Sequence, residues 1–477
     1  MPENELHWCD LSALSATIQA RELSPPELIE HFARRIEALN PGLNAFRLMC
    51  LDSARERARA LARELEAGHN RGPLHGLPFA AKDLFDVQGL PTSAGCPLLE
   101  HTCAVQHATV IARLEAAGMI LLGKTNTVQF AYGGAGVNTQ HGTPHNPWHP
   151  IHHLPGGSSS GSAVAVAAGL APMALGTDTG GSVRIPAALC GLSGLKTTVG
   201  RISRAGVYPL SWSLDSVGPL CRNVRDTALI FDALNGEDAA DASTHGHPLQ
   251  TLSGALDAPL GDLRFAVAES VFWDEVNDEV AGAARAGAAQ IAALGGQLQS
   301  RAFPQAQRAL ELNPRGLVIA AEAYTLNREL IDEHFAALDP IVAQRMVKGR
   351  DVTAGEYLQG IHAWNDLRAE TMAALADIDI LICPTTMEAA RPLATVEHDM
   401  QAYSDLNLRY LRNTAIGNIL NLCALSIPCG LNRAGLPIGL MLYAKPFDER
   451  TLLRAGHALQ QNTDWHRQHP DLGWLQA

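Results

Sequence analysis

The sequence predicts an α/β fold with a largely buried sheet, and three observations lead to this class. Between residues 74 and 235, short apolar segments alternate with glycine-rich turns and helices of small residues, as in sheets that helices cover. Strand-like segments return at 379–383 and 438–442, near the end of the chain. Of the 477 residues, 47% are hydrophobic and 18% are charged, so the chain can bury a large core and lacks the composition of a disordered protein.

The first 70 residues are predicted to form helices that pack on the rest of the protein. Ser24-Pro25-Pro26-Glu27 has the pattern of a capping box with proline at the first helical position, and apolar residues follow at helical spacing through Leu39. Pro41-Gly42 is expected to end that helix. A second helix, rich in Arg and Glu, is predicted from about 53 to 67.

Residues 71–477 are predicted to form one large domain. Its first part alternates helices and strands, with strands expected at 77–81, 119–122 and 173–176 and helices at 107–117 and 163–169. Residues 236–261 are polar and irregular, and we expect them at the surface. One strand at 263–267, helices over 274–375 and a last helix at 449–460 complete the pattern. Because strands return later, we predict a helix-rich insertion at about 236–375.

Composition and charge exclude several classes of function. The formal net charge of −13 argues against binding to a nucleic-acid backbone, which needs clustered positive charge. The longest apolar stretch, residues 163–175, is too short to span a bilayer, and the acidic N-terminus does not resemble a signal peptide. Nine cysteines occur without a C-x-x-C pair. We expect a reduced cytoplasmic protein without a membrane or nucleic-acid partner.

One motif suggests nucleotide binding but does not fit it. Residues 118–125 match the phosphate-loop pattern G-x-x-x-x-G-K-[ST] letter for letter. A phosphate-binding loop needs an open backbone nest after a strand, whereas the four variable positions here are bulky and apolar and follow a predicted helix. The order is therefore helix–strand, and we predict a core strand at this place.

Two loops rich in glycine and serine, residues 155–162 and 176–182, are the strongest candidates for a functional site. A helix of ~10–12 residues from Ser160 and the strand that returns from it cover similar distances, so both loops can meet at one end of a hairpin. Ser158 and Ser182 are then expected to be neighbours. Gly180-Gly181 allow close approach of a substrate, and backbone N–H groups there would stabilise an oxyanion. A flexible linker is disfavoured, because linkers are not expected inside an α/β core.

A serine nucleophile needs a base, and the sequence offers two sources. Lys82 ends an apolar segment, where desolvation would lower its pKa from about 10.4 toward neutrality; the alternative is a surface ion pair with Asp83 or Asp86. Histidines also precede the first loop, but the prolines among them favour an irregular surface loop over a metal site. These histidines are His141, His145, His149, His152 and His153.

Taken together, these residues resemble the amidase signature family. Its glycine- and serine-rich block is similar to Pro155–Ser182 with the residues that follow to Ala187, and its lysine segment to 81–92. Further similar motifs are Gly123–Asn126, Asp215–Pro219 and Gly435–Leu440. Such motifs in this order are highly specific, and the similarity is weakest between about 236 and 375. The resemblance implies the amidase signature fold, a large mixed sheet surrounded by helices.

The resemblance also implies a mechanism that needs no metal or organic cofactor. By motif position, Ser182 corresponds to the nucleophile, Ser158 to a bridging serine after a cis peptide bond, and Lys82 to the base. The tetrahedral oxyanion would be held by backbone N–H groups of Thr179, Gly180, Gly181 and Ser182. Arg184 matches the family and is expected to be a structural ion-pair partner. Where many relatives have an arginine before the first loop, this chain has His152-His153-Leu154.

The leading hypothesis is a stand-alone amidase that converts a small or medium carboxylic amide to acid plus ammonia or amine through an acyl-enzyme. One alternative is the glutaminase subunit of a tRNA-dependent amidotransferase, although Val342–Tyr357 looks more like the stand-alone amidases. A non-enzyme alternative is a nucleotide-binding protein that uses the glycine-rich loops. The substrate pocket is expected near Ala131 and Tyr132, with Trp212 as a further candidate, and core packing is an equal alternative for each. The expected partner is a small-molecule amide, and a homodimer is left open.

Overall fold

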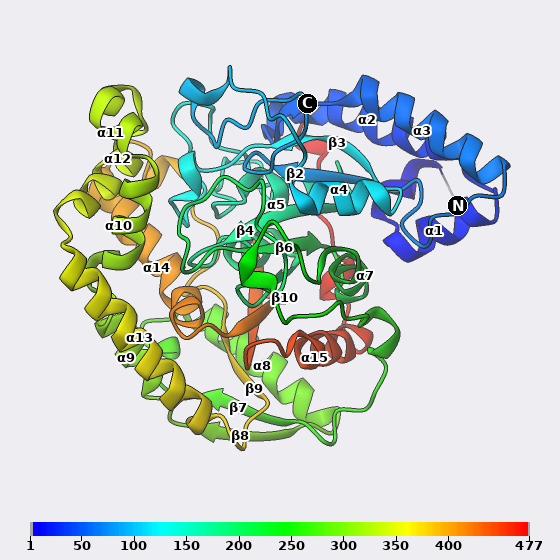
Figure 1. Ribbon diagram of the computed structural model, residues 1–477. Coiled ribbons are helices and arrows are strands. Elements are labelled where there is room, and N and C mark those ends of the chain that lie inside the picture. Colours follow the sequence, from blue (N-terminus) through cyan, green and yellow to red (C-terminus); the bar gives the residue numbers. More distant parts are fainter. Residues whose placement is uncertain (1–2, 476–477) are drawn as a thin grey trace.

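The computed structural model describes residues 3–475, and within them eleven strands form one sheet (Figure 1). The strand order is β1-β3-β2-β4-β6-β5-β10-β11-β9-β7-β8. Strand β2 runs parallel to β3 and β4, and β7 runs parallel to β8 and β9, while the other pairs are antiparallel. The sheet is therefore mixed, as the predicted fold class requires. The strands are β1 (Phe46–Met49), β2 (Pro78–Lys82), β3 (Ile120–Thr125), β4 (Met173–Asp178), β5 (Ser193–Lys196), β6 (Ser216–Cys221), β7 (Arg264–Ala268), β8 (Gln297–Arg301), β9 (Ile380–Pro384), β10 (Cys423–Leu431) and β11 (Pro437–Ala444).

The N-terminal helices α1 (Leu11–Gln19), α2 (Pro25–Leu43) and α3 (Leu51–Glu66) pack beside the sheet end that β1 forms (blue in Figure 1). The capping box is confirmed, since Ser24 N–H donates to Glu27 Oε2 at 2.8 Å and Glu27 N–H donates to Ser24 Oγ at 3.3 Å. The helix was expected to end at Pro41-Gly42, but α2 continues to Leu43, so the predicted end is one or two residues too early. Pro41 lies in the last turn, where a missing N–H removes a single helical hydrogen bond.

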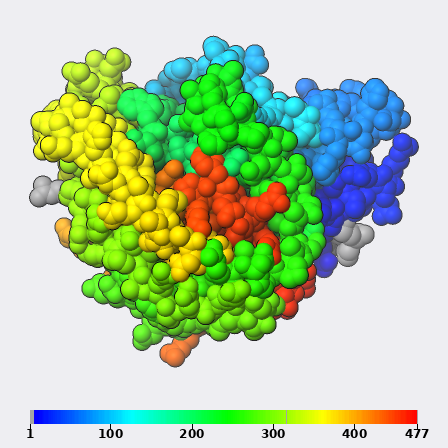
Figure 2. Space-filling model, turned by 60° about the horizontal axis from the view of Figure 1, so that its bottom comes forward, coloured from blue at the N-terminus to red at the C-terminus, as the bar shows by residue number. Residues whose placement is uncertain are grey.

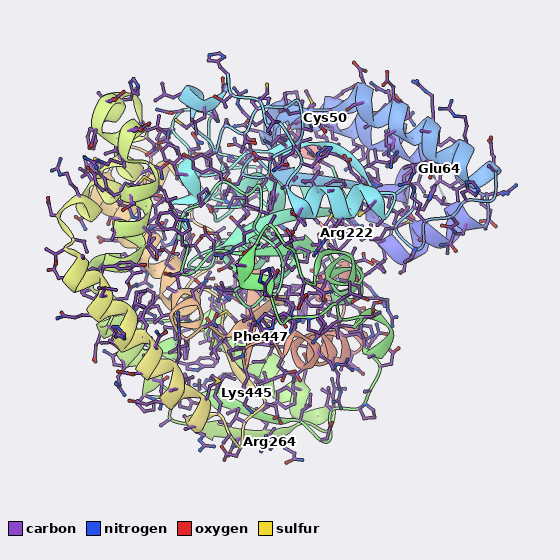
Figure 3. All side chains as sticks on the ribbon, in the orientation of Figure 1. Cys50, Glu64, Arg222, Arg264, Lys445 and Phe447 are labelled. Atoms are coloured by element: carbon purple, nitrogen blue, oxygen red, sulfur yellow. The ribbon has the colours of Figure 1, made fainter. Side chains whose placement is uncertain are left out.

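Residues after β6 and in the C-terminal segment contact this N-terminal region. Trp8 stacks on His469 with ring centroids 4.4 Å apart. Arg222, labelled in Figure 3, follows β6, and its Nη2 donates to the carbonyl of Cys9 at 2.5 Å. These contacts connect residues 8–9 with the middle of the sheet at Arg222 and with the C-terminal segment at His469.

The central part of the chain follows the predicted alternation. Strand β3 covers the residues of the phosphate-loop pattern and is buried throughout, so the prediction of a core strand is confirmed. Helix α5 is also buried at every position, because it carries only small side chains and lies beneath other elements. The helices of this part are α4 (Thr109–Ala116), α5 (Ser160–Ala167), α6 (Arg184–Cys190) and α7 (Val224–Leu234).

Residues 236–375 are rich in helices but also contribute β7 and β8 to the far edge of the sheet. The strand expected at 263–267 is confirmed as β7, whereas β8 has no counterpart among the predicted elements. Its sequence, QLQSR, is polar and largely exposed, so it lacks the apolar signal of a buried strand. The division into domains stays a prediction. The helices here are α8 (Asp278–Ala293), α9 (Gln305–Glu311), α10 (Leu317–Leu326), α11 (Arg328–His334), α12 (Pro340–Met346) and α13 (Ala354–Ala374).

The C-terminal part returns to the middle of the sheet. Strands β9 and β11 and helix α15 (Glu449–Gln461) confirm the expected late elements. Helix α14 (Met400–Ile419), orange in Figure 1, was not expected and lies between the sheet and the outer helices. On the face in Figure 2, the yellow segment that includes α13 borders the orange and red C-terminal segment. Within residues 3–475, no helix is both long enough and apolar enough to cross a membrane.

Candidate active site

The two glycine- and serine-rich loops meet at one edge of the sheet, as their spacing predicts. Strands β2 and β4 are parallel neighbours, so their carboxyl ends lie at the same edge. Lys82 ends β2, and the second loop follows β4. The first loop leads into α5, and Ser159 N–H donates to the carbonyl of Ser182 at 3.2 Å. The chain therefore brings a lysine and both loops together.

Lys82 is buried against the first loop. Its Nζ donates to Ser158 Oγ and to Thr177 Oγ1, each at 2.8 Å, and the peptide bond before Ser158 is cis. Burial lowers the pKa of Lys82 to about 7, although the charges of Asp215 and Asp178 oppose that shift. A surface ion pair of Lys82 is thus excluded.

The neighbouring carboxylate has another partner. Asp83 forms its ion pair with Lys124, whose Nζ lies 2.6 Å from Asp83 Oδ1. Lys124 is the lysine of the phosphate-loop pattern, and its side chain is buried in this pair. It therefore serves the packing around β2 and β3 and is not available to a phosphate.

Ser182 lies in the turn between β4 and α6 with 4% of its surface exposed. Asp178 organises this turn, since Oδ1 accepts from Gly181 N–H at 2.9 Å and Oδ2 from Val183 N–H at 3.1 Å. The same carboxylate pairs with Arg184 at 3.0 Å, which confirms the predicted structural role of Arg184. Burial alone would raise the pKa of Asp178, but Arg184 above all lowers it to about 2. The loop is thus built around a permanently charged carboxylate.

Backbone N–H groups around Ser182 differ in availability. Gly181 N–H is already donated to Asp178. In the part of the chain that the structure describes, the N–H groups of Thr179, Gly180 and Ser182 donate to no protein acceptor. The Thr179 hydroxyl donates to Asp215 Oδ1 at 2.5 Å, which holds this end of the loop. Three of the four predicted backbone donors therefore remain for an anion beside the Ser182 side chain.

Gly181 is required by the geometry of the turn. Its φ is +137°, and a Cβ at this position would lie 2.1 Å from Thr414 Oγ1. Thr414 belongs to α14, and its hydroxyl donates to the carbonyl of Gly180 at 2.7 Å. Any side chain at Gly181 would therefore displace the helix that supports the loop.

The three candidate pocket residues lie in different surroundings. Tyr132 lines a cavity of about 630 Å³ between α14 and the segment formed by α12 and the residues after it to Lys348, which we call the α12 region. Trp212 is 53% exposed and lines a smaller cavity of about 240 Å³ that also reaches Thr177 and Asp215. Ala131 is buried with a φ of +59° and is not among the residues that line either cavity. The structure thus brings Tyr132 to the larger cavity and leaves Ala131 in the core.

The histidines before the first loop pack on one another. His145 and His152 stack with centroids 4.4 Å apart, and His149 lies 4.4 Å from His153. His141 Nε2 lies 2.9 Å from Glu100 Oε1. Among residues 3–475, no group of three or more His, Cys, Asp or Glu side chains is arranged to hold a metal ion.

Several residues of the site carried no assigned role in the sequence. Thr177 and Asp178 stand inside the second loop, and Asp215 opens the 215–219 motif; an acidic residue in a glycine-rich turn is the signal that points to Asp178. Leu411 and Thr414 lie on the unexpected helix α14. Nothing local in their sequence indicates a site, because only packing brings α14 against the loop.

Sequence comparisons cover nearly the whole chain. A family model described as "Amidase" matches residues 27–453. A protein named 2-amino-5-chloromuconic acid deaminase from Comamonas testosteroni is 37% identical over 448 residues, which cover 93% of this chain and 94% of the relative. A subunit of the glutamyl-tRNA(Gln) amidotransferase from Roseiflexus sp. (strain RS-1) is 36% identical over 98% of this chain and 99% of its own.

Solved structures agree with these matches. A peptide amidase in complex with the competitive inhibitor chymostatin superimposes with a TM-score of 0.85 at 29% identity, covering 97% of this chain and 99% of that chain. A 6-aminohexanoate cyclic dimer hydrolase complexed with substrate has a TM-score of 0.87 at 27% identity, covering 98% and 99%. The mixed sheet and its helices are therefore shared with these enzymes over almost their full length.

Proposed function

The chain belongs to the amidase family and is a hydrolase of carboxylic amides, and on that premise we propose that Ser182 is its nucleophile, with Ser158 and Lys82 as the groups that move the proton. The observation that carries this proposal is the 2.8 Å contact of the buried Lys82 Nζ with Ser158 Oγ. A lysine whose pKa is lowered to about 7 is partly neutral at physiological pH and can act as a base.

The proton path follows from the hydrogen-bonding capacity of a neutral amine. Such an amine has two N–H bonds and one lone pair, so Lys82 donates to Thr177 and accepts the hydroxyl proton of Ser158. Ser158 takes the proton of Ser182 in turn, and the Ser182 oxygen attacks the amide carbonyl. The product of this step is a tetrahedral oxyanion and a protonated Lys82.

The intermediate then collapses to an acyl-enzyme. Its negative oxygen lies against the N–H groups of Gly180 and Ser182, which donate to no protein acceptor within residues 3–475 and can stabilise the developing charge. Thr179 holds the loop through Asp215, and Gly181 contributes through its contact with Asp178. The proton passes through Ser158 to the leaving nitrogen as the C–N bond breaks. Water repeats the attack on the ester and releases the carboxylic acid.

Labelling with a fluorophosphonate tests the nucleophile. We expect one phosphonyl group on Ser182, located by mass spectrometry of the digested protein, and loss of ammonia release from amides in parallel. The unlabelled enzyme should hydrolyse members of a panel of aliphatic, aryl and amino-acid amides. Undiminished ammonia release from fully labelled protein would overturn the assignment.

A second candidate activity, glutamine hydrolysis within an amidotransferase, is favoured by the similarity to the amidotransferase relative. It requires glutamine as substrate and a partner protein that receives the ammonia. Glutaminase activity measured on the pure chain, and again after copurification from its host, distinguishes this candidate. Activity that appears only with a copurifying protein would favour the amidotransferase role over a stand-alone amidase.

A further inference from the structure

The cavity of about 630 Å³ beside the nucleophile loop has an unusual charge for this chain. The cations on its wall include Arg345, Lys348 and Arg412, although the whole chain has a formal net charge of −13. We call it the cationic cavity. An acidic protein that collects cations at one cavity creates a local positive potential, which attracts anions.

None of these three cations forms an ion pair with a carboxylate in the part of the chain that the structure describes. Arg345 Nη1 donates to the Tyr132 carbonyl at 2.6 Å, and its guanidinium lies 4.0 Å from the centre of the Tyr132 ring. Arg412 Nη1 donates to the Asp274 carbonyl at 2.6 Å. Lys348 is exposed. Neutral groups thus orient both arginines, and no carboxylate within residues 3–475 is bonded to either guanidinium.

Glu275, a carboxylate on the cavity wall, already forms an ion pair. Glu275 lies 3.5 Å from Arg409 Nη1, and Arg409 also pairs with Glu388 at 2.7 Å. A ligand that enters the cavity therefore meets unpaired positive charge and a carboxylate that already has its partner. Such a lining favours a carboxylate and disfavours an ammonium group.

The cavity adjoins the nucleophile loop through α14. Leu411 lines the cavity, and its Cδ2 would lie 3.4 Å from a Cβ built at Gly180. The Leu411 side chain also lies against Gly134, since its Cγ would be 2.9 Å from a Cβ built at Gly134. Leu408 also lines the cavity, so the wall that α14 contributes carries apolar side chains as well as cations.

We propose that the cationic cavity binds a carboxylate at the far end of the acyl group, so that the preferred substrates are monoamides of dicarboxylic acids without an α-amino group. This inference rests on the proposed amidase reaction at Ser182. The amide end reaches the loop, the methylene chain crosses Leu411, and the carboxylate meets Arg345, Lys348 and Arg412. Hydrolysis then adds water, breaks the C–N bond and releases a dicarboxylate and ammonium.

Three amides of the same chain length test how a carboxylate and an ammonium group on the substrate each affect turnover. Glutaric acid monoamide carries the carboxylate, pentanamide replaces it by a methyl group, and glutamine adds an ammonium group to the first compound. We expect kcat/KM for the monoamide to exceed that of each other compound at least tenfold, since a charged hydrogen bond to substrate is lost in pentanamide. The succinic and adipic monoamides are tested beside it to allow for length. No preference of any monoamide over its neutral analogue would overturn the inference.

Substitutions of the three cations test which of them bind the substrate carboxylate. Lys348→Gln changes an exposed side chain, so folding is not at risk, and Arg345→Gln and Arg412→Gln follow it. Each should lower the ratio of kcat/KM for glutaric acid monoamide to that for pentanamide about tenfold, mainly through KM. Arg350→Gln is the matched control, because Arg350 lies on the same short helix as Lys348, pairs with Asp351 at 3.6 Å and does not line the cavity. An equal ratio in Lys348→Gln, Arg345→Gln and the control would contradict the proposal.

A binding experiment distinguishes failure of the carboxylate inference from failure of the proposed nucleophile. Titration calorimetry of glutaric acid monoamide into Ser182→Ala measures the cavity without turnover, and Lys348→Gln in that background should weaken binding about tenfold while Arg350→Gln does not. If Ser182→Ala still hydrolyses amides, the proposed nucleophile is wrong whatever the binding shows. If it is inactive and binds pentanamide as well as the monoamide, only the carboxylate inference fails.

Discussion

Asp178 and Arg184 form an ion pair at 3.0 Å in which neither side chain has any exposed surface. A buried pair of this kind adds little stability compared with apolar side chains, but removing one partner leaves an unpaired charge in the interior. The pair also receives N–H bonds from Gly181 and Val183, on either side of Ser182. It therefore determines the shape of the turn that carries Ser182.

Asp178→Asn is expected to lower the free energy of unfolding by about 3–5 kcal/mol, because Arg184 then stays charged and buried. Denaturant titration measures this loss. As a matched control, Glu269→Gln breaks a half-exposed pair with Arg285 at 2.8 Å and should change the free energy by about 1 kcal/mol or less. Equal effects of the two variants would show that burial of the pair does not matter.

The pH dependence of stability should reflect the same carboxylate. The pKa of Asp178 is lowered to about 2 in the folded protein, below its value of about 3.9 in the unfolded chain. Its contribution is therefore fully present above about pH 4 and is lost as the pH falls toward about 2. Denaturation midpoints from pH 6 to pH 2 should fall more steeply for the wild type than for Asp178→Asn. Parallel curves would contradict this.

Ser182→Ala is expected to reduce kcat by about 10⁴-fold or more with the fold unchanged, because it removes the oxygen that we propose attacks the amide carbonyl. Ammonia release measures the activity, and circular dichroism checks the fold. Ser160→Ala is a suitable control, since the buried Ser160 Oγ has no hydrogen-bond partner within residues 3–475. Comparable activity of Ser182→Ala and Ser160→Ala would exclude Ser182 as the nucleophile.

Lys82 should control the pH profile of turnover. Its pKa is lowered to about 7. With the neutral amine as the proposed base, kcat/KM is expected to rise with pH through about 7 and then to level off. Lys82→Arg retains the positive charge but stays protonated at any working pH, so it should be inactive up to about pH 9. A profile without an inflection near neutrality would argue for a different base.

Gly181→Ala should destabilise the protein and abolish turnover. An alanine there has to adopt a φ of +137° with its Cβ 2.1 Å from Thr414 Oγ1, and the backbone strain alone is about 1–3 kcal/mol. Gly254→Ala provides the comparison, because no atom of the described residues 3–475 lies within 4 Å of a Cβ at that position. Thermal melting and ammonia release of both variants test this requirement. A fully active, stable Gly181→Ala would show that the turn tolerates a side chain.

Elements with a strong local signal were predictable, and those without one were not. The apolar runs of β3, β4 and β11 and the capping box at Ser24 are visible in the sequence because they bury side chains or satisfy helix ends locally. The polar edge strand β8 was missed, since only pairing with β7 makes it a strand. Helix α14 was missed as well, and it supplies Leu411 and Thr414 to the site.

The order of the motifs and the family that they resemble are visible in the amino-acid sequence, which also points to Lys82, Ser158 and Ser182 as candidates for one reaction. What surrounds these three residues depends on how the chain folds. The parallel pairing of β2 and β4 brings Lys82 to Thr177, and the packing of α14 against the loop and the α12 region builds the cationic cavity. Local sequence does not show these features, because pKa values and cavity charge depend on burial and on neighbours in space, which residues far apart in the chain provide.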